Sequence, residues 1–431
     1  MSAIARVLLE SGETVSGSDR QLSPLAQGLA DSGVQVMIGH RPENILGAEV
    51  VVRSSAVGDD NPEVAAALQA GVPVLKRADF LGAWIGPERG RRLVAVAGTH
   101  GKTTTTAMVS WLLSALGQDP SYIIGGVSLN LGGNAHASRM PLFVIEADEY
   151  DRMFLGLRPE IAVITNIDLD HTEFAGPTIA DIAREKVGIS KESSTLVVGD
   201  VNDALNPIWS GAPSRGLVRR IEHFDCIGNE LAIGGRLLDV STPRGLYRDV
   251  MVPLHGRHQG DNASIAIVAV EEFFDAQISE DILREGMSTV EMPGRFEVLG
   301  HRPLVIIDGA HNPAGADVCS AVFFDDFSPV GRRILVVGTL KGRDPELTLG
   351  ALRVDDFDVV VTCTAPSPRG LESAVLAATA RSMGCDEVLE CTSVEEACAK
   401  ALSIAGEDDA VLVAGSLYVV GSARTTLRRS L

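Results

Sequence analysis

The chain has 431 residues, and 37 lysine and arginine residues against 57 aspartate and glutamate residues give it a formal charge of −20. An acidic chain is repelled by nucleic acid and by anionic membranes unless basic residues cluster, so we expect neither as a partner. The longest basic run, residues 89–92, is short and is interpreted as solvated surface. The apolar fraction of 45% excludes wholesale disorder. The length corresponds to about three domains.

The apolar runs and the cysteines indicate where in the cell the protein is located. Charge, glycine or proline interrupts every apolar run before the ~18 residues that cross a bilayer, so no membrane span is predicted. Residues 1–12 carry Arg6 and Glu10 in an amphipathic helical pattern, unlike the apolar core of a signal peptide. We therefore expect a cytoplasmic protein. No two cysteines are spaced for metal binding, and we expect reduced, mostly buried thiols at Cys226, Cys319, Cys363, Cys385, Cys391 and Cys398.

Short Val/Ile/Leu-rich runs alternate with helical patterns along the whole chain, which predicts an α/β fold with parallel sheets. The first domain, residues 1–88, is expected to contain a helix at its start, strands at 14–17, 34–38, 49–52 and 72–75, and helices at 24–32 and 62–70. This pattern is typical of a nucleotide-binding domain, but the domain begins with a helix. The first strand and Gly-rich turn that normally open such a domain do not precede that helix.

Two loops that contain proline and glycine divide the rest of the chain. A linker at 86–90 leads into a central domain, residues 89–292, with strands at 93–97, 142–147 and 161–166. A hinge is expected at 291–294. The third domain, residues 293–431, is expected to hold strands at 304–307, 333–337, 359–363 and 410–414. This is a three-domain α/β architecture.

The strongest chemical motif begins at the first central strand. An apolar run, 93–97, leads into Gly98-Thr-His-Gly101-Lys102 and four threonines that open a helix. Amides of such a turn and of a helix N-terminus bind phosphate, Lys102 adds a positive charge, and Thr103 can reach Mg²⁺. The motif departs from the usual P-loop pattern because Val96 occupies the position of the first glycine.

Two further strands end in acidic and polar residues. Glu146 and Asp148 follow one apolar run, and the segment 165–171, which ends in His171, follows the next. Open α/β sheets bind ligands at such strand ends. Oxygen ligands beside a phosphate site favour Mg²⁺. Composition and spacing thus predict an Mg²⁺-dependent ATP enzyme.

These motifs together identify a resemblance. The loop at 98–106, the carboxylate cluster at 146–151 and the segment 165–171 resemble the Mur ligase superfamily, whose members join an amino acid to a carboxylate through an acyl phosphate. Residues 1–165 resemble the branch that adds L-alanine to UDP-N-acetylmuramate. The later motifs, including 182–189, 256–262, 293–297, 308–313 and 415–421, resemble the folylpolyglutamate and dihydrofolate synthase branch.

The resemblance implies roles for individual residues of the central domain. The turn residues Gly98, Thr99, His100 and Gly101, with Lys102, Thr103 and Thr104, would bind ATP. Thr103 and Glu146 would hold one Mg²⁺, and Glu146 with His171 a second. Lys186 matches a lysine that many members carry as a carbamate, which would make it a metal ligand. From the residues alone, Lys186 is a helix-surface lysine.

The remaining roles concern the adenine, the third domain and the UDP-sugar. Asn262 matches the adenine-side asparagine. Arg295 and Asp308 match residues that close over ATP, His311 could orient the amino acid or phosphate, and Lys341 is a weaker candidate for contact with an anion. In the first domain, Asp19, Ser54 and Ser55 are the candidate substrate-binding residues, because Asp19 ends a strand where such sheets bind a nucleoside hydroxyl.

Three functions remain open at this stage. The first domain favours an ATP-dependent, ADP-forming ligase that joins an amino acid, L-alanine by resemblance, to UDP-N-acetylmuramate in peptidoglycan synthesis, acting as a monomer or homodimer. The later motifs favour a dihydrofolate or folylpolyglutamate synthase. A degenerate nucleotide-binding regulatory protein is the third. Of the glycine-rich run typical of the UDP-N-acetylmuramate branch, only Met1-Ser2 is present, which predicts weak pyrophosphate binding if Met1 is the true start.

Overall fold

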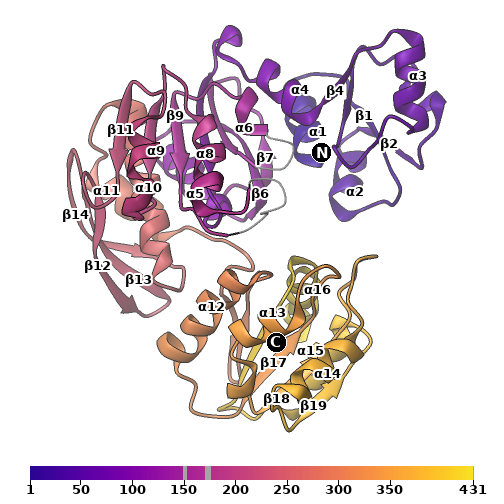
Figure 1. Ribbon diagram of the computed structural model, residues 1–431, viewed down its shortest axis with the longest axis vertical. Helices are drawn as coiled ribbons and strands as arrows, with labels where there is room; N and C mark the ends of the chain where they lie inside the picture. The colour runs from indigo at the N-terminus through magenta and orange to yellow at the C-terminus, as the bar shows by residue number, and fades with distance from the viewer. Residues whose placement is uncertain (149–152, 170–175, 431) are drawn as a thin grey trace. The chain divides into compact units, whose positions relative to one another are not determined.

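The computed structural model describes residues 1–148, 153–169 and 176–430. The chain forms two compact units, one of residues 1–229, 238–252 and 260–290, the other of residues 230–237, 253–259 and 291–431. Both contain parallel sheets with crossover helices, so the predicted α/β class is confirmed (Figure 1). Within the described residues, no helix is long and apolar enough to cross a membrane.

The first 90 residues build two small parallel sheets. Their elements are α1 (Ser2–Glu10), β1 (Ser16–Asp19), α2 (Pro24–Asp31), β2 (Gln35–Ile38), a 3-10 turn (Pro42–Ile45), β3 (Val51–Arg53), α3 (Pro62–Ala70), β4 (Val74–Lys76), α4 (Arg77–Trp84) and a 3-10 turn (Pro87–Arg89). β1 pairs with β2 and β3 pairs with β4. The described chain opens with a helix, as expected.

Three of these strands begin two residues later than the sequence predicted, at Ser16 instead of 14, Val51 instead of 49 and Val74 instead of 72. The amides of Glu13 and Val72 explain two of the shifts, because they still cap the preceding helices by bonding to Leu8 O (3.0 Å) and Ala67 O (2.9 Å). The helix at 62–70 is confirmed. Its start is fixed by the Asn61 side chain, which accepts a hydrogen bond from Glu63 N.

The central sheet has seven strands in the order β11-β10-β9-β5-β8-β6-β7 (Figure 1). The strands are β5 (Arg92–Ala97), β6 (Ser121–Ser128), β7 (Gly133–His136), β8 (Leu142–Glu146), β9 (Ile161–Ile164), β10 (Thr195–Val198) and β11 (Gly216–Arg219). β5 is parallel to β8 and to β9. Their carboxyl ends therefore lie at one edge of the sheet. The three predicted strands are present, although β8 ends one residue and β9 two residues early.

Helices cover this sheet, and a smaller sheet follows it. The helices are α5 (Lys102–Ala115), α6 (Met153–Gly156), α8 (Ile179–Lys186), α9 (Asn206–Ser210), α10 (His258–Phe274) and α11 (Glu280–Ser288). Five of the six residues of β5 are buried, which explains its unbroken apolar sequence. The small sheet has the order β12 (Asp225–Ala232), β13 (Gly235–Thr242), β14 (Gly245–Val252).

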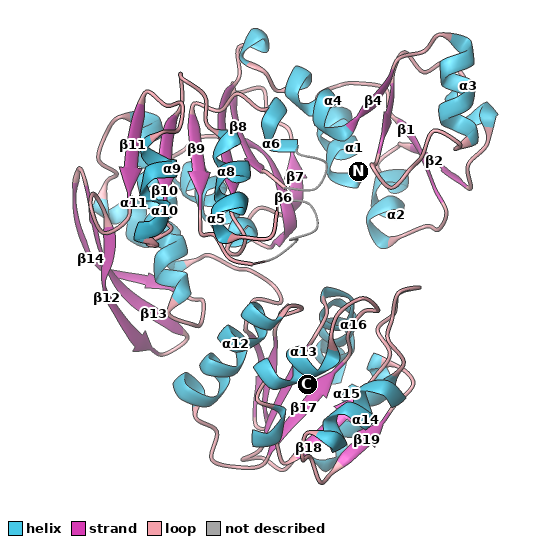
Figure 2. Ribbon diagram, in the orientation of Figure 1, coloured by secondary structure: helices cyan, strands magenta, loops and turns pink. Residues whose placement is uncertain are grey.

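The C-terminal sheet has six strands in the order β15-β16-β20-β17-β18-β19 (Figure 2). Its elements are β15 (Glu297–His301), β16 (Leu304–Ile307), α12 (Pro313–Ala321), β17 (Arg333–Val337), α13 (Pro345–Ala351), β18 (Val359–Thr362), α14 (Ser373–Ser382), β19 (Val388–Glu390), α15 (Val394–Ile404), β20 (Ala410–Ala414) and α16 (Leu417–Ser430). Of the four predicted strands, three match and β18 ends one residue early. The six cysteines of the chain are free thiols, five of them buried.

A buried ion pair helps to hold the second unit together. The Arg236 side chain is 2% exposed and lies 3.0 Å from the carboxylate of Asp326, which is itself 17% exposed. Asp326 lies in a π-helical turn (Val322–Phe327) that extends α12. A buried guanidinium loses its hydration, so its carboxylate partner is needed to offset the loss.

We expect Asp326→Ala to lower the free energy of unfolding of this unit by about 3 kcal/mol, because it leaves a buried charge without this partner. The measurement is hydrogen–deuterium exchange at the amides of β16, β17 and β20. Asp325→Ala is the matched control, since Asp325 is 68% exposed and lies 3.5 Å from an exposed Arg353. Equal exchange in the two variants would contradict the prediction.

Candidate functional site

The predicted phosphate loop is a tight turn between β5 and α5. Gly98 and Gly101 adopt φ values of 142° and 77°. A Cβ at Gly98 would lie 1.9 Å from Thr165 Oγ1, and one at Gly101 would lie 2.3 Å from Asn262 Oδ1. Only glycine fits both positions. α5 then starts at Lys102, so its N-terminal amides follow the turn directly.

The segment after β9 holds this turn in place. His100 N donates to Asn166 Oδ1 at 2.8 Å, and Thr165 Oγ1 donates to His100 O at 2.5 Å. Asp168 N donates to Thr99 Oγ1 at 3.0 Å. β9 ends earlier than predicted, although Thr165 N still donates to Ala97 O and Asn166 O still accepts from Thr99 N, each at 2.9 Å. The turn is therefore preorganised for an anion.

Lys102 and Thr104 occupy the first turn of α5. Lys102 Nζ donates to Gly98 O at 2.8 Å and to Thr99 O at 3.1 Å, which keeps the ammonium over the turn. The side chain of Thr104 is buried, with 4% exposure. The predicted ATP-binding residues at 98–104 thus lie in one loop and helix start. Their geometry fits a polyphosphate.

Thr103 and Glu146 form a pair of oxygen ligands beside this loop. Thr103 Oγ1 donates to Glu146 Oε1 at 3.0 Å, and Gly125 N donates to Glu146 Oε2 at 2.6 Å. Burial raises the pKa of the Glu146 carboxyl, and the Gly125 amide, the charge of Lys102 and the Thr103 hydroxyl oppose that rise. A hydroxyl and a carboxylate next to a phosphate cradle fit a hard cation such as Mg²⁺.

The sequence analysis missed the glycines that make room for this pair. A Cβ at Gly125 would lie 2.7 Å from the Glu146 carboxylate, and a Cβ at Gly126 would lie 3.0 Å from Thr103 Cγ2. Both residues belong to β6, two strands from β5. The available signal was a glycine pair inside a strand pattern, which often marks close approach of a neighbour.

The second predicted metal position is only partly within the described residues. His171 lies outside them, so its predicted role stays a prediction. Lys186, the last residue of α8, is buried with 4% exposure, so its interpretation as a helix-surface lysine is wrong. Among the residues that the structure describes, no three His, Cys, Asp or Glu side chains gather as a metal site.

Asn262 lies beside the phosphate loop. It is 6% exposed on α10, and its Oδ1 accepts a hydrogen bond from Thr105 Oγ1 at 3.4 Å. The close approach to Gly101 noted above puts its amide under the turn. The structure thus brings Asn262 together with residues 98–105.

Three predicted residues of the third domain, Arg295, Asp308 and His311, lie near one another in the second unit. The Asp308 carboxylate accepts hydrogen bonds from Phe296 N and Ala310 N, each at 2.8 Å. Burial raises the pKa of this carboxyl, and the charge of Arg295 opposes the rise. His311 Nδ1 lies 2.8 Å from Gly309 O, just before α12. Lys341 is exposed, in the turn before α13.

The candidate substrate residues of the first domain lie at strand ends. Asp19 is the last residue of β1, while Ser54 and Ser55 follow β3. Beside Asp19 there is a network that the sequence analysis missed. Ser18 Oγ donates to Glu63 Oε2 at 2.7 Å and lies 3.1 Å from His40 Nδ1. These contacts join residues up to 45 positions apart, so no local pattern shows them.

Comparison with known protein families matches nearly the whole chain. The Mur ligase family catalytic domain matches residues 1–89, the Mur ligase middle domain matches 96–270, and the Mur ligase glutamate ligase domain matches 294–417. The UDP-N-acetylmuramate–L-alanine ligase of Bordetella avium is 37% identical over 336 residues, covering 73% of this chain and 70% of the relative. The ligase of the same name from Chlorobium phaeobacteroides is 36% identical, covering 73% and 68%.

Solved structures show the same fold. The UDP-N-acetylmuramate-alanine ligase of Thermotoga maritima superimposes with a TM-score of 0.82 and 23% identity, covering 100% of this chain and 96% of that one. The folylpolyglutamate synthase of Mycobacterium tuberculosis, solved with ADP, gives a TM-score of 0.72 and 27% identity, covering 81% and 94%. Both predicted resemblances are confirmed. The P-loop, the strand-end glutamate and these relatives agree, and the chain belongs to the Mur ligase family.

Proposed function

We propose that this chain is an ADP-forming ligase that joins L-alanine to the carboxylate of UDP-N-acetylmuramate in peptidoglycan synthesis. One observation carries the proposal: two curated ligases with that substrate in their name are 36–37% identical to this chain across about 70% of their length. The preformed phosphate loop supports the use of ATP. The interdomain boundaries near 88 and 292 are part of this proposal, as is a cytoplasmic location, where the nucleotide substrates occur.

The phosphate loop would bind the ATP polyphosphate. The amides at the start of α5 would bind phosphate oxygens, and Lys102 would add the charge that stabilises a transferring phosphoryl group. Asn262, which supports the turn at Gly101, would contact the nucleotide. Arg295 and Asp308 would approach the nucleotide from the third domain, with His311 orienting the amino acid or phosphate.

Thr103 and Glu146 would hold one Mg²⁺. Glu146 with His171 would hold a second, to which Lys186 would bind as a carbamate. Bound there, the metal would neutralise charge on the phosphates during transfer. Glu146 fits this role because partial burial strips water from its carboxylate, and a cation would relieve that loss of hydration.

The reaction itself would take two steps. The muramate carboxylate attacks the γ-phosphorus in line, and ADP leaves, giving an acyl phosphate. The amine of the amino acid then attacks the acyl carbon, phosphate leaves, and the amine loses a proton as the amide forms. Acyl phosphates hydrolyse in water, so the third domain is expected to close about the hinge at 291–294 while the intermediate exists.

A folylpolyglutamate synthase is the second candidate. The observation in its favour is the 27% identity and TM-score of 0.72 to the M. tuberculosis enzyme of that name. That enzyme covers 81% of this chain, whereas the muramate ligase of T. maritima covers 100%. The full-length match favours the muramate ligase.

The substrate is tested by phosphate release from ATP and Mg²⁺ with UDP-N-acetylmuramate or dihydropteroate, each crossed with L-alanine, glycine, L-serine and L-glutamate. We expect turnover only with the muramate substrate, and fastest with L-alanine. Turnover that needs dihydropteroate and glutamate would overturn the proposal in favour of the folate ligase. Tight ATP binding without ligation of any pair would point to a regulatory protein.

The P-loop assignment predicts unequal effects of two similar substitutions. Thr103→Val removes the hydroxyl but keeps the shape, and we expect it to weaken the apparent Mg²⁺ affinity about 10- to 100-fold. Thr103→Ser keeps the hydroxyl and should stay near the wild type. Lys102→Ala should lower kcat about 10²- to 10³-fold, because the charge over the turn is lost. Mg²⁺ titrations of phosphate release measure all three. Identical titrations for Thr103→Val and Thr103→Ser would remove Thr103 from the metal site.

The proposed carbamate predicts chemical rescue. A buried lysine ammonium beside a cation is repelled, whereas addition of CO₂ to Nζ with loss of a proton gives a carboxylate that can bind metal. We expect Lys186→Ala to lose at least about tenfold in activity. Acetate or propionate should restore part of it. Lys186→Arg, which cannot form this carbamate, should stay inactive. Full activity of Lys186→Ala, or no rescue by any short carboxylate, would contradict the carbamate.

A further inference from the structure

A cavity of about 680 Å³ lies at the amino-terminal edge of the central sheet. Its walls are the turn at 89–91, just before β5, and the segment 137–141, just before β8, while the end of α1 closes a third side. β5 runs for six residues from the cavity edge to the P-loop, which is about 20 Å of strand. The cavity is therefore separate from the phosphate loop.

Three arginines line the cavity, namely Arg89, Arg91 and Arg139. Across residues 1–148, 153–169 and 176–430, none of the three forms an ion pair, although the chain carries 20 more acidic than basic groups. In an acidic protein, arginines that lie together without carboxylate partners are unusual. The cavity therefore carries positive charge that the described protein does not neutralise.

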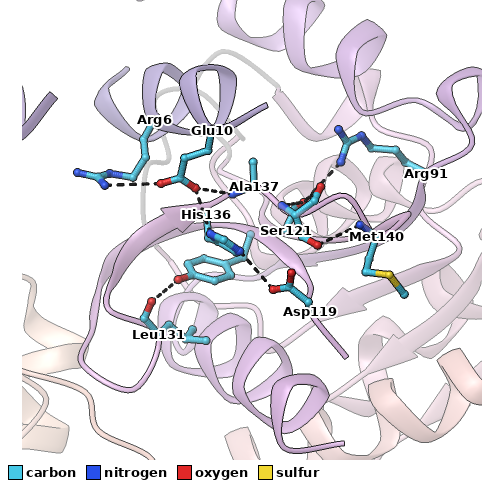
Figure 3. Close-up of polar contacts among 11 residues, drawn as sticks. Arg6, Glu10, Arg91, Asp119, Ser121, Leu131, His136, Ala137 and Met140 are labelled. Atoms are coloured by element: carbon cyan, nitrogen blue, oxygen red, sulfur yellow. Dashed lines mark hydrogen bonds and ion pairs between the residues drawn. The ribbon is translucent and has the colours of Figure 1, made fainter. Parts of the chain in front are cut away.

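The carboxylate among the lining residues is already engaged. Glu10 lies 3.6 Å from Arg6 and 3.0 Å from His136 Nδ1, and it accepts a hydrogen bond from Ala137 N at 2.8 Å (Figure 3). Its charge is thus directed towards groups other than the three arginines. An anion in the cavity would meet the arginines without displacing Glu10.

Arg91 is held by a buried platform. Its guanidinium carbon lies 4.8 Å from the ring centre of Trp84 and 5.5 Å from that of Phe143, and Nη1 lies 3.5 Å from the Oγ of the buried Ser121. Stacking fixes the plane of the group and leaves its remaining N–H donors to bind an anion. Burial, followed by repulsion from Arg89, lowers the pKa of Arg91, and a bound anion would relieve both effects.

The cavity walls are fixed by hydrogen bonds. Ser138 N donates to Ser121 Oγ at 2.9 Å, and Met140 N donates to Ser138 Oγ at 3.0 Å (Figure 3). Arg92 N donates to Pro141 O at 2.8 Å, which ties one wall to the other. Little order would have to be gained on binding, so the cavity is preorganised.

We propose that this cavity binds a small molecule that carries at least two phosphate or carboxylate groups. Guanidinium groups match both kinds of oxyanion through paired N–H donors. A volume of about 680 Å³ suits a metabolite-sized ligand better than a single ion. The inference does not depend on the substrate assigned above, because it uses none of the P-loop residues.

The test is calorimetric titration of the full chain, without Mg²⁺, with tripolyphosphate and separately with citrate. Arg89→Glu/Arg139→Glu should weaken binding at least about tenfold, since two charge-assisted contacts become repulsive. Both side chains are exposed, and an unchanged thermal midpoint verifies folding. Arg429→Glu, the same change at an exposed arginine in α16, should bind as the wild type does. Tighter binding of tripolyphosphate would assign a phosphorylated ligand, and tighter binding of citrate a polycarboxylate.

Binding at the P-loop is the competing explanation, and Lys102→Ala separates it. We expect Lys102→Ala to keep a site that Arg89→Glu/Arg139→Glu loses. Hydrogen exchange of wild-type amides at 89–91 and 137–141 should slow when tripolyphosphate binds. Three results would overturn the proposal: wild-type affinity in the double variant, loss of all binding in Lys102→Ala, or no binding of either probe at millimolar concentration.

Discussion

The phosphate site depends on one contact, in which the segment after β9 holds the turn after β5. Asn166 and Thr165 bind the amide and carbonyl of His100, and Thr165 leaves no space for a side chain at residue 98. Parallel pairing of β5 with β9 brings both segments to one edge. An unsupported turn would lose about 1 kcal/mol or more of backbone entropy per residue on closing around a phosphate. Here folding has already ordered the turn.

Burial of the carboxylates of Glu146 and Asp308 costs folding free energy. The pKa of Glu146 is raised, so its carboxyl ionises more readily in the unfolded chain than in the folded one. The free energy of unfolding therefore falls as pH rises from the unfolded pKa to the folded one. The Gly125 amide and the Thr103 hydroxyl offset part of this penalty. Asp308, which directly follows β16, shows the same balance with two amides and Arg295. Each unit thus holds one carboxylate at or just after the end of a strand. Positioning it there for a ligand lowers the free energy of unfolding.

The sequence predicts best those strands whose residues form an unbroken apolar run. β16 and β20 are continuous apolar runs, and β17 is one after Arg333; nearly all their residues are buried, and their predicted bounds match. β12, β13 and β14 were missed because they include many polar residues, and β12 has no buried residue at all. α4 was missed because it follows β4 at once, without a side-chain cap at Lys76.

The candidate site divides in the same way. The approach of Thr103 to Glu146 follows from the rule that strand ends meet at one edge, so sequence reasoning could place both. The fit of Gly125 against Glu146 and the burial of Lys186 depend on contacts between distant segments. An Ala-Arg-Glu-Lys run looks like an exposed helix face, and only tertiary packing shows that Lys186 turns inward.

The two edges of the central sheet obtain positive charge in different ways. At the carboxyl edge, the start of α5 supplies it, together with the ammonium of Lys102. At the amino edge, none of the described residues that line the cavity begins an α-helix, so side chains must supply it. The run at 89–92 does this unevenly: Arg92 pairs with Glu160 at 2.8 Å and lies 3.9 Å from the ring centre of Phe273, whereas Arg91 stacks on Trp84 and faces the cavity. The run at 89–92, which the sequence suggested to be solvated surface, thus has two roles. Arg92 makes structural contacts, and Arg91 lines the cavity where we propose that an anion binds.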